Sequence, residues 1–365
     1  MEFVWGRYSA LFYTGAGVIL FIGVGIFFGG FWFFLAVGFL FLFLIGISDY
    51  TQKKRAVLGN FPLMGRFRFI FEAIRPELRQ YFWEADNDEL PYSRNQRAMV
   101  YQRSKEILAA RPFGSDENQY LEDFNWLNHS ISPSKIEDND FRIRVGEGKN
   151  SYDISILNIS GTSFGSISPK AIQSFSAGAK KGGFAHNTGE GSLSKYHEQG
   201  GGDTIWQIST GYFGCRTEDG KFDENLFADK AKLQQVKMIE IKLSQGAKPG
   251  HGGMLLGAKV SPEIAKTRNV PVFEDVISPH KHSEFSTPAE LLTFVEKLRS
   301  LSDGKPVGIK LCIGHPWEFI AIVKAMVQTN MDVDFITVDG SEGGTGAAPA
   351  TDDAHPRGRA RTSRS

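Results

Sequence analysis

The sequence predicts an α/β domain with a parallel sheet, preceded by a segment that spans a membrane. Two observations carry this prediction. An uncharged run of 41 residues occupies positions 8–48, and from residue 151 onward short β-branched or apolar runs alternate with helix signals. The length of 365 residues suits one large or two medium domains.

The uncharged run is long enough for two short membrane helices, because one membrane helix uses about 20 residues. It also holds ten of the thirty Phe residues. We expect a hairpin of helices at 11–28 and 31–47 with a turn at Gly29 and Gly30. One long signal-anchor helix and a cleaved signal peptide are the alternatives. The basic cluster at 52–55 places the following domain on the cytoplasmic side by the positive-inside rule.

Residues 60–150 are expected to form a helical N-terminal region, with a clear helix pattern at 94–110. Three arginines near the membrane end, Arg66, Arg68 and Arg75, suit contact with anionic head groups. A solvated helix face explains the same residues at least as well.

Composition excludes several classes of protein. The 41 basic and 41 acidic residues give a net charge of zero, so no bulk electrostatic attraction to nucleic acid is expected. Two cysteines, Cys215 and Cys312, cannot form a disulfide framework and fit a reducing compartment. The scattered histidines, including His280 and His282, read as ordinary loop residues, so no metal site is expected.

Six strands are expected in the region 151–349, with helices between them. The expected strands are residues 154–159, 183–186, 205–209, 238–243, 307–312 and 333–338. Two helix starts are legible: Ser168 caps a helix that begins with Pro169, and residues 287–290 form a capping box. Alternating strands and helices of this kind predict a parallel sheet.

Glycine-rich loops follow four of these strands. They occupy residues 161–166, 187–191, 245–253 and 339–346. In parallel α/β folds the ligand lies at the carboxyl edge of the sheet, where glycine lets the backbone approach a phosphate or a flat ring. No loop matches a Rossmann fingerprint, a P-loop or a nucleophile elbow.

Two lysines interrupt apolar strands. Lys242 and Lys310 must find a negative partner if they face inward, because a buried ammonium is otherwise costly. A reduced flavin would supply negative charge, and a buried carboxylate such as Glu240 or Asp339 would do the same. Strand alternation alone leaves open which lysine faces inward.

Several strings resemble the FMN-binding synthase domain of glutamate synthase, in the same order and at similar spacing. They are SFGSISPKA at 163–171, NTGEGS at 187–192, IEIKLSQGAKPGHGG at 239–253, GIKL at 308–311 and ITVDGSEGGTGAAP at 336–349. Residues 72–82 and the apolar run are similar to stand-alone, membrane-attached members that lack the amidotransferase domain. The resemblance covers about residues 1–349.

The resemblance implies a (β/α)8 TIM-type barrel that binds FMN at its carboxyl face. Reduced flavin there converts 2-iminoglutarate, formed from 2-oxoglutarate and ammonia, into L-glutamate. Matching positions place Ser163, Phe164, Gly165 and Ser166 beside the isoalloxazine, Gln207 and Lys310 near its pyrimidine edge, and Gly343, Gly344, Thr345 and Gly346 in the last cofactor loop. Lys248 is suited to hold a substrate carboxylate, and Glu190 to orient the imine or the proton transfers.

Departures from the family pattern limit this expectation. The glutaminase domain and the three-cysteine iron–sulfur segment are absent from the sequence, so we expect free ammonia, no iron–sulfur cluster and an unidentified electron donor. Residues 350–365 read as a disordered polar tail. Six strands cannot close an eight-stranded barrel, so the barrel is expected to be incomplete through truncation and to bind FMN poorly or not at all. A non-catalytic truncated membrane protein and another FMN-barrel oxidoreductase are the alternatives.

Overall fold

The structure is a computed structural model of the chain. It describes residues 6–82, 94–107, 118–120, 122, 126, 128–138, 140–247 and 252–340. The chain divides into two compact units, Met1–Asn139 and Asp140–Ser365. Each unit is described below by itself.

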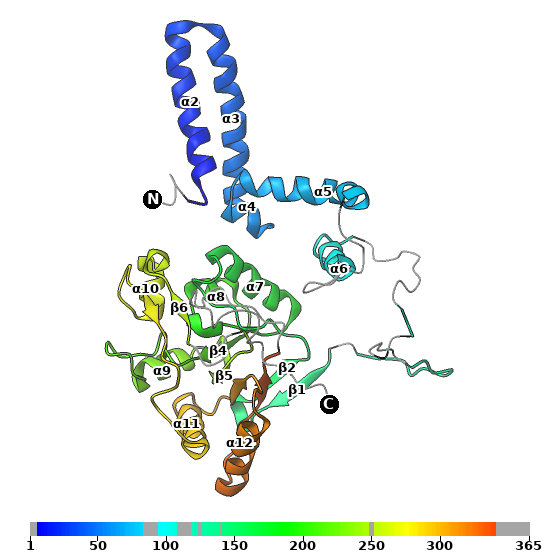
Figure 1. Cartoon of the computed structure of the whole chain (residues 1–365), viewed down its shortest axis with the longest axis vertical. Helices are drawn as coiled ribbons and strands as arrows, with labels where there is room; N and C mark the ends of the chain where they lie inside the picture. The colour runs from blue at the N-terminus through cyan, green and yellow to red at the C-terminus, as the bar shows by residue number, and fades with distance from the viewer. Residues whose placement is uncertain are drawn as a thin grey trace. The chain divides into compact units, whose positions relative to one another are not determined.

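In the first unit the apolar run folds as two helices, α2 (Ser9–Phe28) and α3 (Gly30–Thr51), which lie side by side in Figure 1. Gly29 joins them with a φ of 93°, a conformation that favours glycine. The helices approach closely: a Cβ on Gly17 would lie 2.3 Å from a ring carbon of Phe39. Both helices are long and apolar enough to cross a membrane.

Three shorter helices follow: α4 (Ala56–Asn60), α5 (Met64–Phe82) and α6 (Arg94–Ser104). The buried carboxylate of Asp49, near the end of α3, fixes the start of α5. It accepts hydrogen bonds from the backbone N–H of Leu63 at 3.1 Å and from Nε and Nη2 of Arg66 at 2.8 and 2.7 Å. Such a bidentate pair sets direction as well as distance.

The second unit contains a parallel sheet that curls into about half of a barrel. Its strand order is β3–β4–β5–β8–β9, and every neighbouring pair is parallel. The strands are β3 (His186–Asn187), β4 (Thr204–Ile208), β5 (Val236–Lys242), β8 (Val307–Leu311) and β9 (Ile336–Val338). Among the described residues the fold is therefore an incomplete TIM-type barrel, as the sequence predicts.

Four further strands form two small antiparallel sheets outside the barrel. In one, β1 (Arg142–Val145) pairs with β2 (Tyr152–Ser155), and in the other, β6 (Met254–Leu255) pairs with β7 (Val276–Ile277). Strand β1 lies within the range 60–150 that the sequence assigns to helices.

The prediction of a first barrel strand at 154–159 is wrong. The chain turns at Asn158, whose side chain donates to the carbonyl of Ser155 and accepts from the N–H of Ala185. Only Ile159 then joins the sheet edge, through an isolated parallel bridge to His186. The start of the expected strand belongs instead to β2.

Helices cover the outer side of the half-barrel (Figure 1). They are α7 (Pro169–Gly182), α8 (Lys195–Gly200), α9 (Glu224–Ala231), α11 (Pro288–Leu301) and α12 (Pro316–Thr329). Helix α10 (Pro262–Arg268) packs instead with β6 and β7. Short 3-10 turns lie at Gly148–Asn150, Gly189–Gly191 and Gly257–Lys259. Both predicted helix starts are confirmed. Ser168 accepts from the N–H of Ala171, and Thr287 and Glu290 form a capping box.

The main core lies between the sheet and helices α9 and α11. Trp206 stacks on Phe227 with ring centroids 5.3 Å apart, and both side chains are fully buried. Ile239, Ile309 and Leu298 belong to the same cluster. Burying such side chains supplies the main favourable contribution to folding.

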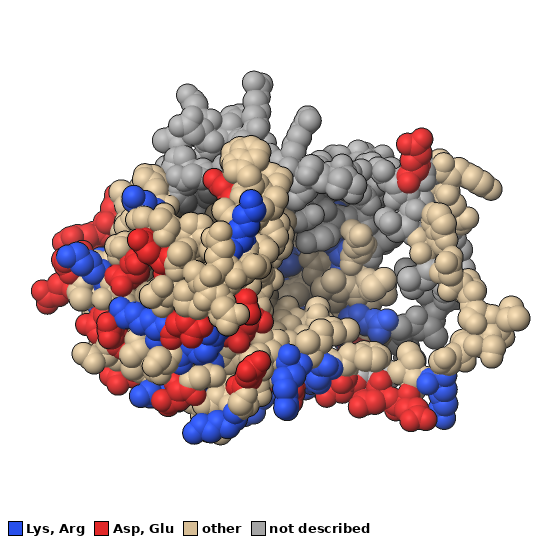
Figure 2. Space-filling model, turned by 90° about the horizontal axis from the view of Figure 1, so that it is seen from below, with Lys and Arg blue, Asp and Glu red and all other residues tan. Residues whose placement is uncertain are grey.

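Charged side chains of both signs are mixed over the face that Figure 2 shows. Many of them pair on the surface, such as Lys297 with Glu224 at 2.8 Å and Arg144 with Asp153 at 3.0 Å. Exposed pairs of this kind contribute about 0–1 kcal/mol each. The surface pairs therefore contribute little to the stability of the fold.

The core predicts a clear contrast between two leucines. Leu298→Ala removes a fully buried side chain from α11 and should lower the free energy of unfolding by about 2–5 kcal/mol. Leu226→Ala, at a half-exposed position of α9, should cost well under half of that. Urea unfolding of the full chain in detergent, followed by circular dichroism, measures both. Equal losses would contradict the assignment of the core.

Candidate functional site

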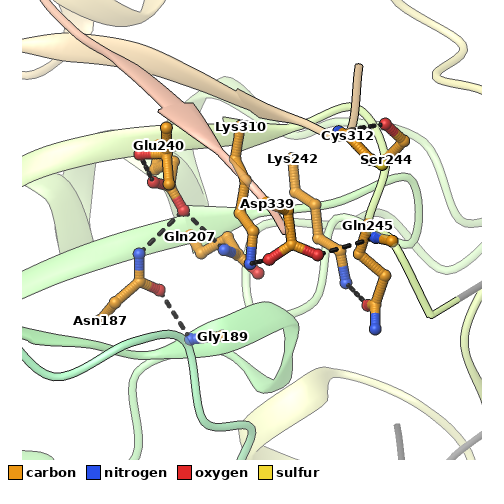
Figure 3. A network of polar contacts seen from close by, with 12 residues as sticks. Asn187, Gly189, Gln207, Glu240, Lys242, Ser244, Gln245, Lys310, Cys312 and Asp339 are labelled. Atoms are coloured by element: carbon orange, nitrogen blue, oxygen red, sulfur yellow. Dashed lines mark hydrogen bonds and ion pairs between the residues drawn. The ribbon is translucent and has the colours of Figure 1, made fainter. Parts of the chain in front are cut away.

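Polar side chains of all five strands of the half-barrel meet at its carboxyl edge (Figure 3). In the strand register Gln207 lies opposite Glu240, Lys242 opposite Lys310, and Lys310 opposite Thr337. The residues between them, such as Ile239, belong to the core under the outer helices. Because side chains alternate along a strand, the polar residues face the inside of the barrel. Lys242 and Lys310 therefore share the inward face.

Glu240 is the centre of this polar layer. Its buried carboxylate accepts hydrogen bonds from Asn187 Nδ2 at 2.8 Å, from Gln207 Nε2 at 2.6 Å and from Thr337 Oγ1 at 2.7 Å. These donors come from β3, β4 and β9. Asn187 Oδ1 in turn accepts from the N–H of Gly189 at 2.9 Å, which links the carboxylate to the loop that follows β3.

Lys310 pairs with Asp339, at 3.0 Å between Nζ and Oδ1. The second oxygen of Asp339 accepts from the N–H of Gly246 at 2.8 Å. One carboxylate thus connects the end of β9, strand β8 and the loop after β5. Of the partners that the sequence leaves open for Lys310, the structure contains a buried carboxylate, and it is Asp339 rather than Glu240.

Lys242 contacts the predicted catalytic residue Glu190. Its Nζ lies 3.2 Å from Glu190 Oε2 and 2.5 Å from Gln245 Oε1. Both side chains of the ion pair are nearly buried. Glu190 belongs to the 3-10 turn Gly189–Gly191, so the pair joins the loop after β3 to the end of β5.

The loop at 163–166 packs directly on that turn. A Cβ on Gly189 would lie 2.7 Å from Ser163 Oγ, and a Cβ on Gly191 would lie 2.7 Å from the carbonyl of Phe164. The Phe164 ring is buried against Tyr196, with centroids 5.4 Å apart. The predicted residues Ser163 and Glu190 are therefore brought together, whereas the Phe164 side chain points into the protein.

Arg268 is a functional candidate that the sequence does not reveal, because nothing in its neighbourhood along the chain marks it. It is buried, and its Nη2 donates to the carbonyl of Phe164 at 2.7 Å. Its guanidinium lies 5.0 Å from the ring centroid of Phe213. Burial lowers the pKa of Arg268 to about 10, while the charge of Glu190 opposes this shift. Arg268 therefore keeps its positive charge at neutral pH beside the loop of Ser166 and Gly165.

His282 is hydrogen-bonded to the carboxyl end of β5. Its Nε2 lies 3.0 Å from the carbonyl of Lys242 and its Nδ1 lies 3.0 Å from the hydroxyl of Tyr212. The carbonyl can only accept, so Nε2 carries the proton and Nδ1 accepts from Tyr212. That hydroxyl also accepts from the N–H groups of Ser283 and Glu284. Burial lowers the pKa of His282 to about 4, so the ring is neutral at pH 7.

Two small cavities lie among the described residues at this edge. One of about 20 Å³ is lined by Glu190, Lys242 and Gln245, and one of about 10 Å³ by Ser166 and Arg268, among others. Each has room for about one water molecule.

A larger cavity of about 350 Å³ lies beside the end of β5, between α11, α12 and the loop 280–288, and shares Leu243 and His280 with the cavity of about 20 Å³. In the part of the chain that the structure describes, no group of three or more His, Cys, Asp or Glu side chains could hold a metal. The predicted residues Lys248, Gly343, Gly344, Thr345 and Gly346, and the tail 350–365, lie outside the described residues.

Comparison with known proteins identifies the family. The family model described as the conserved region in glutamate synthase matches residues 123–356. The chain belongs to the glutamate synthase family. The prediction drawn from the strings at 163–349 is thereby confirmed at the level of the family.

Several curated glutamate synthase relatives resemble the chain. The glutamate synthase large subunit-like protein YerD of Bacillus subtilis is 38% identical over 351 residues, covering 83% of this chain and 66% of its own length. The archaeal glutamate synthase (NADPH) of Methanocaldococcus jannaschii is 32% identical over 246 residues, or 67% of this chain and 44% of its own. A glutamate synthase large subunit-like protein of Rhizobium meliloti is 32% identical over 193 residues, or 52% and 39%. The chain thus spans 66% or less of these relatives.

In this glutamate synthase family member, Glu240→Gln should destabilise the fold. The amide would turn an NH2 group toward neighbours that all donate, so at least one buried donor loses its acceptor. The expected loss is about 1–3 kcal/mol for each unpaired group. Urea unfolding measures it, and Glu218→Gln on an exposed turn is the matched control with an expected change below about 0.5 kcal/mol. Equal free energies of unfolding for Glu240→Gln and Glu218→Gln would contradict the role of Glu240.

Stability should also fall in mild acid. His282 and His186 have pKa values lowered by burial to about 4, whereas an unfolded histidine takes up its proton near pH 6.5. The contribution of these neutral histidines to the free energy of unfolding is complete above pH 6.5 and is lost as the pH falls toward 4. Each histidine lowers that free energy by up to about 1.4 kcal/mol for every pH unit. Urea unfolding at several pH values tests this. His282→Gln should reduce the slope by about one proton, and an unchanged slope would count against the assignment.

Proposed function

We propose that this chain is a membrane-attached flavin oxidoreductase of glutamate synthase type. It forms L-glutamate by reduction of 2-iminoglutarate, which arises from 2-oxoglutarate and ammonia. One observation carries the proposal: the inward-facing cations Lys242 and Lys310 lie at the carboxyl edge of a parallel half-barrel, each beside a carboxylate. That edge is where parallel α/β enzymes bind their ligands.

The donors at this edge fit the pyrimidine end of FMN. Lys310 Nζ and Gln207 Nε2 both donate to carboxylate oxygens, which are anionic acceptors like a reduced flavin. When bound, FMN supplies hydride for the reduction. The phosphate end of such a cofactor is usually held by loops after later barrel strands, and the loop that follows β9 lies outside the described residues.

Binding of a ligand at this edge requires some of these side chains to change partners. Lys310 must turn from Asp339 toward the ligand, while Asp339 keeps its bond to the N–H of Gly246. Glu190, held by Lys242, is positioned to orient the imine or to exchange a proton with it. Lys248, six residues after β5 in a Gly-rich segment of the sequence, is assigned to the substrate carboxylate because a lysine ammonium can form such a charged pair.

Ammonia is proposed to arrive free and the electron donor to be external. The names of the archaeal relatives include NADPH, so NADPH is the first donor to test. The helices α2 and α3 are proposed to cross the membrane as a hairpin. The cluster of Lys53, Lys54 and Arg55 then keeps the barrel on the cytoplasmic side.

A second candidate function is a non-catalytic membrane protein of the same family. The ion pairs Lys242–Glu190 and Lys310–Asp339 favour it, because they match the two inward-facing cations within the protein itself. The expectation that FMN binds weakly or not at all also stays a prediction. One titration addresses both.

The test is flavin binding by the full chain in lipid nanodiscs, measured by quenching of FMN fluorescence. Lys310→Met should weaken binding about tenfold or more, because a charge-assisted hydrogen bond is lost. Lys221→Met, at an exposed position, should bind FMN like the unaltered protein. Circular dichroism checks that both variants are folded.

A second measurement addresses the reaction. The FMN-loaded protein is reduced and supplied with 2-oxoglutarate and 15N-ammonium, and 15N-glutamate is measured by mass spectrometry. Flavin binding without labelled glutamate would refute the reaction and leave the flavoprotein assignment intact. Absence of flavin binding would refute the flavoprotein assignment and support the non-catalytic candidate.

A further inference from the structure

Helix α5 exposes an apolar stripe along one side. Its members recur at intervals of three and four residues, which places them on one face of a helix. They are Met64, Phe67, Ile70, Phe71 and Ile74, each between 42% and 60% exposed. Contiguous apolar surface of this kind marks a contact site with a protein or a membrane.

The opposite side of α5 is already occupied. A Cβ on Gly65 would lie 3.0 Å from the carbonyl of Val57 in α4, and the guanidinium of Arg55 lies 4.7 Å from the centroid of the Phe69 ring. Glu72 pairs with Lys105, just beyond α6, at 3.5 Å. Figure 1 shows α4 and α6 on the side of α5 that points away from the α2–α3 hairpin. The stripe therefore lies on the same side as the hairpin.

The start of α5 is tied to the end of an apolar helix. The buried carboxylate of Asp49, two residues before α3 ends, holds Arg66 by two hydrogen bonds and Leu63 by a third. In Figure 1, α5 runs across the axis of α3 rather than along it. If α3 spans a bilayer, α5 begins at the depth where the span ends, which is the level of the head groups.

We propose that α5 lies in the plane of the membrane, with its apolar stripe in the boundary between head groups and acyl chains. This inference rests on the membrane attachment proposed above. An in-plane helix has one apolar face and basic residues at its border, which reach lipid phosphates. Arg68 and Arg75 lie along one border of the stripe, seven residues apart. Arg68 donates to the hydroxyl of Tyr101 in α6 at 3.1 Å, so the contact with phosphates is assigned to Lys53 and Lys54, which follow α3 after Gln52.

Lipid is a better occupant than a protein partner for two reasons. Large apolar side chains are exposed on α3 toward the end from which α5 starts as well, such as Phe41, Leu44 and Ile47. The border of the stripe carries arginines, whereas acidic residues would suit a basic protein surface. One bilayer therefore covers both surfaces without a second molecule.

The test uses spin labels on the full chain in vesicles of 70% phosphatidylcholine and 30% phosphatidylglycerol. Single cysteines are introduced by Phe71→Cys in the stripe, Ala73→Cys on an exposed position off the stripe, and Ile19→Cys in the middle of α2, all in a Cys312→Ser background. Cys215 is fully buried. Electron paramagnetic resonance then compares collisions with apolar oxygen and with a water-soluble nickel chelate.

The label at position 71 should collide more with oxygen, and the label at position 73 more with the chelate. A label that meets lipid at position 19 but water at position 71 would overturn the in-plane helix and leave the membrane hairpin standing. A label at position 19 in water would remove the membrane attachment, and the in-plane helix with it. Protection of position 71 from both reagents would show a protein contact and would also overturn the proposal.

Discussion

The buried carboxylate of Glu240 is the constraint on which the carboxyl edge of the half-barrel depends. A charge taken out of water must be matched by donors, and an unmatched one costs several kcal/mol. Here the donors are Asn187, Gln207 and Thr337, which come from three other strands. The register of β3, β4, β5 and β9 must therefore be the one that brings these three groups to one point, since a slip of one residue would turn them to the opposite face.

The same alternation divides each strand between two tasks. Residues such as Ile239 and Ile309 pack under the outer helices, while their neighbours Glu240 and Lys310 form the polar interior. The apolar core and the polar interior therefore share the same short strands, and changes on one face act on the other through the backbone. The ion pairs of the interior also satisfy the lysines when no ligand is present, so the fold does not need a cofactor to neutralise them.

Features set by residues close together in the sequence could be predicted from it, whereas features set by contacts between distant segments could not. The strands near 205–209, 238–243 and 307–312 and the starts of α7 and α11 depend on local patterns, and they were located to within a few residues. The strand at 154–159 was misplaced because its end is set by Asn158 bonding to Ala185, 27 residues away. The choice of Asp339 for Lys310, and the approach of Arg268 to Phe164, are contacts between distant segments that no spacing along the chain reveals.

Asp339 also links strand β8 to the loop after β5 at this edge. Its two oxygens hold Lys310 and the N–H of Gly246, so an anion that took Lys310 would leave the carboxylate bonded to Gly246 alone of these two. Capture of such an anion would therefore require the ion pair to open. The association rate would be limited by the opening of this ion pair rather than by diffusion, and it would rise with ionic strength, in contrast to a site that simply attracts an anion.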